Sequence, residues 1–355
     1  MFFVGLIIVC LRVMKFVDLR IGLIFNGSLR FLCWDGNSEK GCGLDDQVLK
    51  LIVLYERLRV GDSSRDGVYG ELKRALAGAA GEKRTKELLE RELDLEGETR
   101  IIRGIWLPYL DGFAQVDVLV IHENFICALE VKNMVGEFYF NSENFQFYRI
   151  VDGNKEGMRN PESQLHRAVK ATEKFFGYKV HGTIVMSSRS GRVAVAPKLY
   201  PAIALDYLPF HIEKMPDARL SLNVEELEGL VRRSRGHYNG PDLLKKHKLT
   251  RDSVEAGVRC LGCGRLACAW IERKWRCSKC GAISSDAHEF ALQEYAVLFG
   301  SELTSKEAYR WLGVTDKYVL IRLLEKFTLK SSGRGKRTII ENKELLASHF
   351  KKIYS

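Results

Sequence analysis

The stretch QVDVLVIHENFICALEVKN, residues 115–133, places charged side chains inside two runs of residues that are otherwise apolar. A polar pair, Glu123-Asn124, separates the two runs. Two β-type runs divided by two turn residues predict a tight hairpin in which His122 lies opposite Phe125. A purely structural sheet would carry valine or isoleucine at the charged positions, so we expect these charges to form a functional site.

The hairpin register predicts where the charges meet. Asp117 lies opposite Glu130 and Gln115 lies opposite Lys132, and the alternation of side chains puts all four on one face. Two carboxylates directly opposite each other destabilise a sheet, whereas a bound Mg²⁺ or Mn²⁺ offsets their repulsion. Lys132 can then stabilise negative charge on a phosphate, which is the chemistry of metal-assisted phosphodiester hydrolysis. A one-residue slip would separate Asp117 from Glu130, and an exposed E-x-K strand is the alternative.

The surrounding pattern is that of an α/β domain with a mixed sheet flanked by helices. Helical leucine spacing begins near Tyr69, and Gly78 and Gly81 are expected to divide that segment into two helices. Asn160 and Pro161 are typical of the start of another helix. Further strands are expected at 99–105, 115–121, 125–131, around 137–150, 182–186, 193–196 and 203–205, with a last helix at 224–233.

Four short motifs occur in an order that resembles the nuclease-related domain, NERD, a branch of the PD-(D/E)xK nuclease superfamily. They are Gly81-Glu82, the QVD that ends at Asp117, EVKN from Glu130 followed by Gly136, and NPESQ at 160–164. The resemblance covers roughly residues 70–240. It implies a restriction-endonuclease-like fold and a nuclease site.

The resemblance also implies a role for individual residues. Asp117 and Glu130 would hold the catalytic Mg²⁺ or Mn²⁺, and Lys132 would be the catalytic lysine. Glu82 would reach the site from the first helix, and Gln164 from the helix that follows the sheet. Each of these two has a simpler interpretation, because Glu82 fits an exposed helix surface and Gln164 fits a capping or packing position.

Five of the nine cysteines lie between residues 260 and 280, which favours metal binding over a disulfide framework. The two C-x2-C pairs are each followed by a glycine, and four thiolates at this spacing are the usual ligands of a structural Zn²⁺: Cys260, Cys263, Cys277 and Cys280. The strands between them predict a zinc ribbon packed around Trp270 and Trp275. Cys268 is expected to be buried and not a ligand. A redox site formed by the cysteines is the alternative. Because metal-binding thiols must be reduced, we expect the protein to reside in the cytoplasm.

The region from Asp286 to the end is expected to be helical. Thr304 and Glu307 have capping-box spacing, Gly313 predicts a turn, and a third helix begins at Thr315, an order typical of a helix-turn-helix. Nucleic-acid contacts are expected at the start of the third helix and in the basic loop 331–337: Lys317, Tyr318, Arg334, Lys336 and Arg337. A protein-interaction module is the alternative.

Charge and length complete the sequence prediction. The chain of 355 residues has a net charge of +10, and residues 241–355 hold 22 Lys and Arg against 13 Asp and Glu, which favours a polyanionic partner. The apolar N-terminus is too short to span a bilayer and lacks signal-peptide features, so no stable membrane insertion is expected. We expect an N-terminal region of uncertain structure (1–66), a nuclease-like domain (67–240), a linker (241–258), a zinc ribbon (259–285) and a helix-turn-helix-like domain (286–355).

Two hypotheses account for these features. The first is a metal-dependent nuclease acting on nucleic acid, with DNA favoured. The second is a nucleic-acid-binding protein whose nuclease fold is inactive. The sequence leaves open DNA against RNA, the substrate structure, and the oligomeric state.

Overall fold

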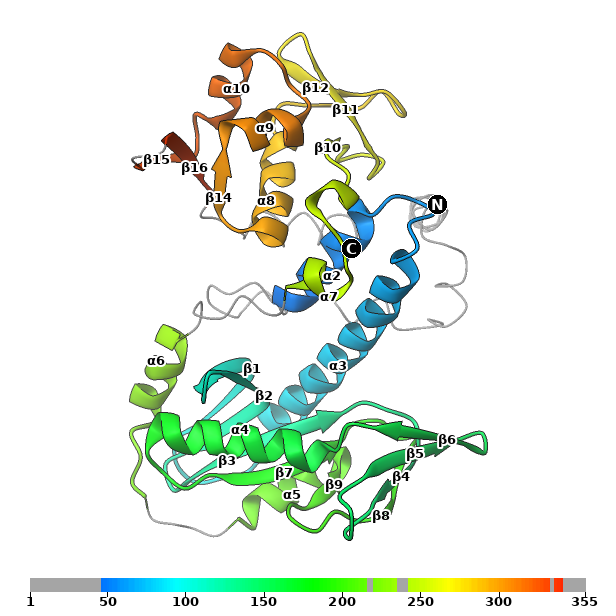
Figure 1. The fold of residues 1–355 in the computed structure, drawn as a ribbon. Helices are drawn as coiled ribbons and strands as arrows, with labels where there is room; N and C mark the ends of the chain where they lie inside the picture. Colours follow the sequence, from blue (N-terminus) through cyan, green and yellow to red (C-terminus); the bar gives the residue numbers. More distant parts are fainter. Residues whose placement is uncertain (1–45, 216–219, 235–241, 333–334, 341–355) are drawn as a thin grey trace, which may run out of the picture. The chain divides into compact units, whose positions relative to one another are not determined.

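The computed structural model describes residues 46–215, 220–234, 242–332 and 335–340. The chain forms two compact units, of which one comprises residues 73–240 and the other combines the residues before 73 with those after 240 (Figure 1). Of the N-terminal region expected at residues 1–66, residues 1–45 lie outside the described part of the chain. Helix α3 (Arg65–Glu92) contributes to both units.

A five-stranded mixed sheet of order β1-β2-β3-β7-β9 organises residues 73–240. The first three strands are antiparallel, and β3, β7 and β9 run parallel to one another. This confirms the predicted α/β class. The strands are β1 (Thr99–Tyr109), β2 (Gly112–His122), β3 (Phe125–Lys132), β7 (His181–Met186) and β9 (Ala202–Ala204).

Helices cover both faces of this sheet. Helix α4 (Pro161–Phe176) lies across one face, as Figure 1 shows, and α6 (Val224–Ser234) packs on the same core. The other face is covered by Leu89 of α3 and by α5 (Leu208–Glu213). Asn160 caps α4 by accepting a hydrogen bond from the Glu162 amide, as its sequence position predicts. Apolar burial on the two faces holds the sheet rigid beneath the charged residues.

A second sheet of order β6-β5-β4-β8 follows β3. It consists of β4 (Gly136–Phe140), β5 (Phe147–Val151), β6 (Asn154–Met158) and β8 (Gly191–Val195). The amphipathic run expected around 137–150 is therefore two strands. Phe138 and Phe147 stack with ring centroids 5.9 Å apart and join the core beneath α4, so the second sheet shares the core of the first.

Helix α3 continues through both Gly78 and Gly81, where two helices were expected. A glycine inside a helix costs about 1 kcal/mol relative to alanine, so a reason for keeping it is required. At Gly81 a Cβ atom would lie 2.7 Å from both the Cβ of Asn133 and the Oγ of Ser187. Glycine at this position lets α3 approach the ends of β3 and β7, whereas the space around Gly78 is open.

The other unit begins with helix α2 (Asp46–Arg57), which packs against α8 (Ala287–Phe299). Arg57 is fully buried, and its Nε donates to the Glu294 carboxylate at 3.1 Å. Arg259 donates to the other oxygen of Glu294 at 3.1 Å. This buried ion network fixes a helix from the N-terminal part of the chain to the C-terminal part.

Residues 242–258, which belong to the expected linker 241–258, are folded. This segment carries α7 (Leu243–Lys246), a 3₁₀ turn (Arg251–Ser253) and the start of β10 (Val258–Arg259), and Val254 bridges to Leu58. The buried apolar side chains Leu243, Val254 and Val258 anchor it. The basic residues between them dominate the local composition, which explains why the sequence suggested a linker.

The C-terminal part contains the expected ribbon strands and helices, and also one sheet that was not expected. Ribbon strands β11 (Leu266–Ile271), β12 (Lys274–Cys277) and β13 (Ile283–Ser284) join β10 in one sheet. Beyond α8 follow α9 (Ser305–Leu312) and α10 (Lys317–Leu324), and the capping box of Thr304 and Glu307 is present. A sheet of β14 (Glu302–Thr304), β16 (Gly335–Ile339) and β15 (Thr328–Ser332) corrects the all-helical expectation.

Candidate functional site

The β2–β3 hairpin has the register expected from its two-residue turn. His122 pairs with Phe125, and the ladder continues to Val118 opposite Leu129. Alternation and turn length were sufficient to predict this because both are local properties of the backbone. The register brings Asp117 to the level of the charged end of β3.

The strand alternation changes at Asp117. Leu119 and Ile121 face the core beneath α4, but on the other side of Asp117 it is Ala114 and Val116 that face this same core. The β1–β2 register places Gly104 at this level, and its φ of 58° lies in the left-handed region that glycine adopts readily. The shift removes the basis for placing Gln115 on one face with Lys132, and the β2–β3 ladder ends at Val118, before it reaches the expected pair of Gln115 and Lys132.

Lys132 is the centre of the polar contacts at the end of β3. Its Nζ donates to Glu130 at 2.5 Å and to Gln164 at 2.7 Å. Glu130 is 6 % exposed, so this carboxylate and the lysine meet in a largely buried setting. Burial by itself would lower the pKa of Lys132, but Glu130 and Asp117 raise it above its usual value. The lysine is therefore an ammonium at neutral pH.

Asp117 contacts the same segment through the backbone. Its Oδ2 accepts a hydrogen bond from the Val131 amide at 2.9 Å, between the two charged residues of β3. Two carboxylates thus act on the ammonium of Lys132, and the positive charge of Arg159 acts on the pKa of Lys132 in the opposite direction. The oxygen donors of Asp117 and Glu130 are of the kind that Mg²⁺ and Mn²⁺ prefer, so these two residues could hold a divalent cation.

The two remaining predicted residues lie on the flanking helices. Gln164, in the first turn of α4, joins the site directly through Lys132. Glu82 is half-buried on α3, one residue after the close contact at Gly81. Hydrogen bonds at the site join Val131 to Asp117 and Lys132 to both Glu130 and Gln164.

Sequence reasoning missed the contacts of Asn133 and Arg84. The Asn133 Nδ2 donates to the Ala77 carbonyl at 2.7 Å, and its Oδ1 accepts from Arg84 at 2.6 Å. Asn133 was visible as the last residue of EVKN. Its partners on α3 lie about fifty positions earlier, so only the tertiary structure brings them together.

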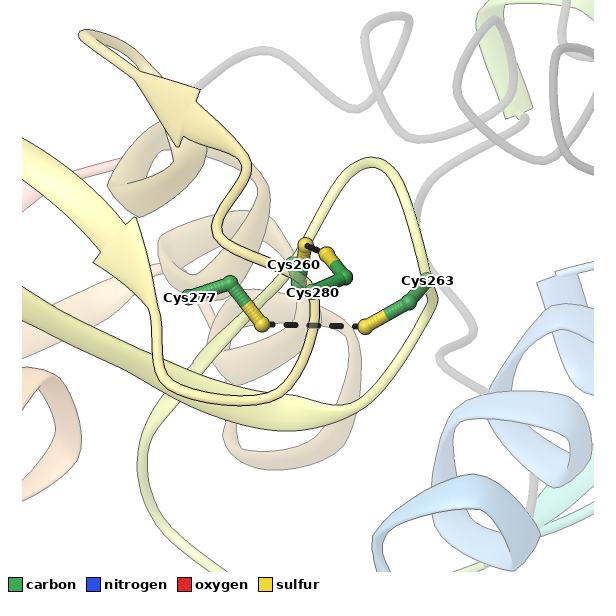
Figure 2. Close-up of side chains that lie close together, drawn as sticks. All are labelled: Cys260, Cys263, Cys277 and Cys280. Atoms are coloured by element: carbon green, nitrogen blue, oxygen red, sulfur yellow. Dashed lines mark hydrogen bonds between the residues drawn. The ribbon is translucent and has the colours of Figure 1, made fainter.

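The four predicted zinc ligands converge. All four Sγ atoms of Cys260, Cys263, Cys277 and Cys280 lie within 4.8 Å of one another (Figure 2). Cys260 and Cys280 are 3.5 Å apart at sulfur, and Cys263 and Cys277 are 3.7 Å apart. Tetrahedral Zn–S bonds of about 2.3 Å require S···S distances of about 3.8 Å, so the geometry fits a structural Zn²⁺.

Backbone amides also prepare the cluster for a cation. The amides of Gly262 and Lys279 each lie 3.4 Å from a sulfur, those of Cys260 and Cys277 respectively. Burial opposes ionisation of Cys277, but the amides of Lys279 and Cys280 lower its pKa to about 6. Cys268 is half-buried, and burial raises its pKa to about 12, so it remains a neutral thiol outside the set of four.

The expected nucleic-acid contacts are described in part. Lys317 and Tyr318 begin α10, and Tyr318 is 80 % exposed. Asp316 caps this helix by accepting hydrogen bonds from the amides of Tyr318 and Val319. Lys336 and Arg337 lie on the backbone of β16, whose side chains are outside the described part of the structure, and Arg334 is outside it altogether.

Comparisons with known proteins bear on one part of the chain. Residues 77–187 match the family model of the nuclease-related domain, NERD. This stretch runs from α3 to Ser187 and contains the whole Lys132 site. Comparison with curated proteins and with solved structures gave no match. Among the described helices, none combines the length and apolar character needed to cross a membrane.

Proposed function

We propose that this domain is a Mg²⁺- or Mn²⁺-dependent nuclease that hydrolyses phosphodiester bonds, with DNA as the favoured substrate, because residues 77–187 match the family model of the nuclease-related domain. The observation that carries this proposal is the convergence of Asp117, Glu130 and Lys132 at the end of β3. Both carboxylates raise the pKa of Lys132, so oxygen donors suited to a divalent cation and an ammonium suited to a phosphate lie close together.

Each residue has a role in the proposed reaction. Asp117 and Glu130 hold the metal ion, which when bound supplies an activated water and compensates phosphate charge. Lys132 stays charged because of Glu130, so its ammonium can donate to negative charge that develops on the phosphate. Gln164 fixes the direction of that ammonium, and Glu82 supplies a further carboxylate from α3.

The C-terminal part is proposed to bind the nucleic acid. The four cysteines would hold a structural Zn²⁺ that stabilises the ribbon, which suits a reducing cytoplasm. Helix α10 follows α9 after a short turn and presents Lys317 and Tyr318, and the β15–β16 hairpin comes next in the chain. This order suits a helix-turn-helix with a following wing, and the basic residues 331–337 would contact phosphates.

The alternative is a nucleic-acid-binding protein in which this fold does not cut. The basic C-terminal third favours it to the same degree, since that part would bind a polyanion in either case. The geometry around Lys132 favours catalysis, because a site without function would have no reason to keep two acids so close to one ammonium.

Cleavage of a substrate panel tests the proposal. Labelled duplex, single-stranded and branched DNA and RNA would be incubated with Mg²⁺, Mn²⁺ or EDTA. We expect metal-dependent cutting by the intact protein that is lost in Glu130→Ala. The control is Glu143→Ala, which removes an exposed glutamate elsewhere in the same domain. Binding to DNA without cutting would replace the nuclease proposal by its alternative.

A further inference from the structure

Helix α3 contacts the segment that carries the candidate catalytic lysine. Gly81 allows the helix backbone to approach Asn133 and Ser187, as described above. Asn133 directly follows Lys132, and the Ser187 amide donates to the Lys132 carbonyl at 3.0 Å. A side chain of α3 that contacts Asn133 or Ser187 therefore contacts a residue that is bonded or hydrogen-bonded to Lys132.

Arg84 is such a side chain. Its Nη2 donates to the Asn133 amide oxygen at 2.6 Å and lies 3.4 Å from the Ser187 carbonyl oxygen. The amide nitrogen of Asn133 is itself fixed on the Ala77 carbonyl. Arg84 is exposed, yet its guanidinium has a defined position because Asn133 joins the helix to the strand end.

The hydrogen-bond partners of Arg84 differ in charge from those of its neighbours on α3. Three other basic residues in this half of α3 form ion pairs with glutamates: Lys83–Glu87, Lys86–Glu90 and Arg91–Glu92. Within the described residues, Arg84 instead bonds to two neutral oxygens. An arginine whose position is fixed by neutral groups keeps its full positive charge for a partner from outside the chain.

We propose that Arg84 binds a backbone phosphate of the nucleic-acid substrate beside the reacting position, and that Asn133 is the positioning residue that orients it. This inference rests on the proposed nuclease function. Guanidinium matches phosphate well because its N–H groups form a planar fork. Neutralising one phosphate displaces counterions, so the contact has a measurable signature in the salt dependence of binding.

The experiment measures affinity against salt concentration. The full-length protein is titrated with a labelled DNA duplex and with the single strand of the same sequence, in Ca²⁺ so that binding is observed without turnover. Arg84→Ala should reduce the slope of log Kd against log salt by about 1. Arg84→Lys and Asn133→Ala keep the positive charge, so they should retain the slope but bind a few-fold more weakly.

The controls separate a phosphate contact from a structural effect. Arg91→Ala removes another exposed arginine from the same helix and should leave the slope unchanged. If Arg84→Ala fails to fold, Arg84→Gln removes the charge while keeping an amide donor for Asn133. A wild-type slope in the neutral variant would overturn the phosphate contact, and wild-type affinity in Asn133→Ala would overturn its positioning role.

The outcome is distinct from that of the nuclease test. If the protein binds DNA but does not cut it, the nuclease proposal fails while the slope still decides whether Arg84 contacts phosphate. If it cuts DNA and the Arg84 variants keep the wild-type slope, only the present inference fails. If it binds neither probe, the Arg84 inference is wrong, and the cleavage panel, which also contains branched DNA and RNA, decides the nuclease proposal separately.

Discussion

The two units of the chain each bury a glutamate beside basic side chains, but the groups around the two glutamates differ. Glu294 has a guanidinium on each carboxylate oxygen, from Arg57 and Arg259, and Arg259 also pairs with Glu56. Two guanidinium groups thus meet two carboxylates there. At the end of β3, Glu130 and Asp117 both act on the ammonium of Lys132.

This difference distinguishes two uses of buried charge. Arg57 donates further to the carbonyls of Glu255 and Gly257 and lies 4.0 Å from the Trp311 ring centroid, so its polar groups are satisfied within the protein. Such a network fixes one arrangement of the chain. At the end of β3, Asp117 and Glu130 instead present oxygen atoms of the kind that bind Mg²⁺ and Mn²⁺, which suits a site that acts on something external.

The largest expected effect is a loss of stability when the proposed Zn²⁺ is removed, because the four-cysteine cluster is joined to the buried ion network around Glu294. Arg259 donates to the Gly264 carbonyl at 2.7 Å, directly after Cys263 of the candidate zinc cluster, so opening the cluster should also remove this contact. We expect Cys263→Ser to lose zinc and more than about 5 kcal/mol of stability in its unit. Zinc content by mass spectrometry and thermal unfolding measure the two losses. Cys268→Ser should retain both.

Glu294→Ala should lower the free energy of unfolding of that unit by about 3–5 kcal/mol, because two buried guanidinium groups lose their partner. Denaturant unfolding followed by tryptophan fluorescence measures the change. Glu325→Ala, which removes an exposed glutamate from the same part of the chain, is the control. An equal and small effect in both variants would show that the network around Glu294 contributes little.

If Asp117 and Glu130 bind a metal ion, Lys132→Gln should lower the rate of cleavage but raise the affinity for Mn²⁺. Cleavage should fall by about 10²–10³-fold, because a donor to the phosphate is lost. Affinity for Mn²⁺ should rise by about tenfold, because a positive charge leaves the carboxylates. Calorimetric titration with Mn²⁺ measures the second effect. Weaker Mn²⁺ binding in this variant would mean that the carboxylates do not form the metal site.

The smallest expected effect concerns the cap of α9. Burial opposes ionisation of Glu307, but the hydroxyl and amide of Thr304 lower its pKa to about 2. This pKa lies below the ordinary value of 4.5, so the stabilisation is complete above about pH 4.5 and is lost as the pH falls towards 2. Glu307→Gln should cost about 1 kcal/mol at pH 7. The difference from wild type should shrink in acid, and a pH-independent difference would contradict this assignment.

The sequence was informative where the decisive interactions are local. The two-residue turn predicted the β2–β3 register, and Asn160 and Thr304 were correctly predicted as helix caps. The shift at Asp117 was not predictable because it coincides with an unusual backbone angle at Gly104 in the neighbouring strand. The contact of Asn133 with α3 was missed for a similar reason, since its partners are distant in sequence. The β15–β16 pairing was not predicted, because the glycine and basic residues of 331–337 were interpreted as a loop.

The division of the chain also has a consequence for its synthesis. Helix α2 leaves the ribosome long before α8, because the 73–240 unit lies between them in the sequence. Arg57 precedes Glu294 of α8 by 237 residues, which take about 12–47 s to make at about 5–20 residues per second. During that time Arg57 and the apolar side of α2 have no native partner. A chaperone that shields such segments during translation should therefore increase the yield of folded protein more than one that acts after release.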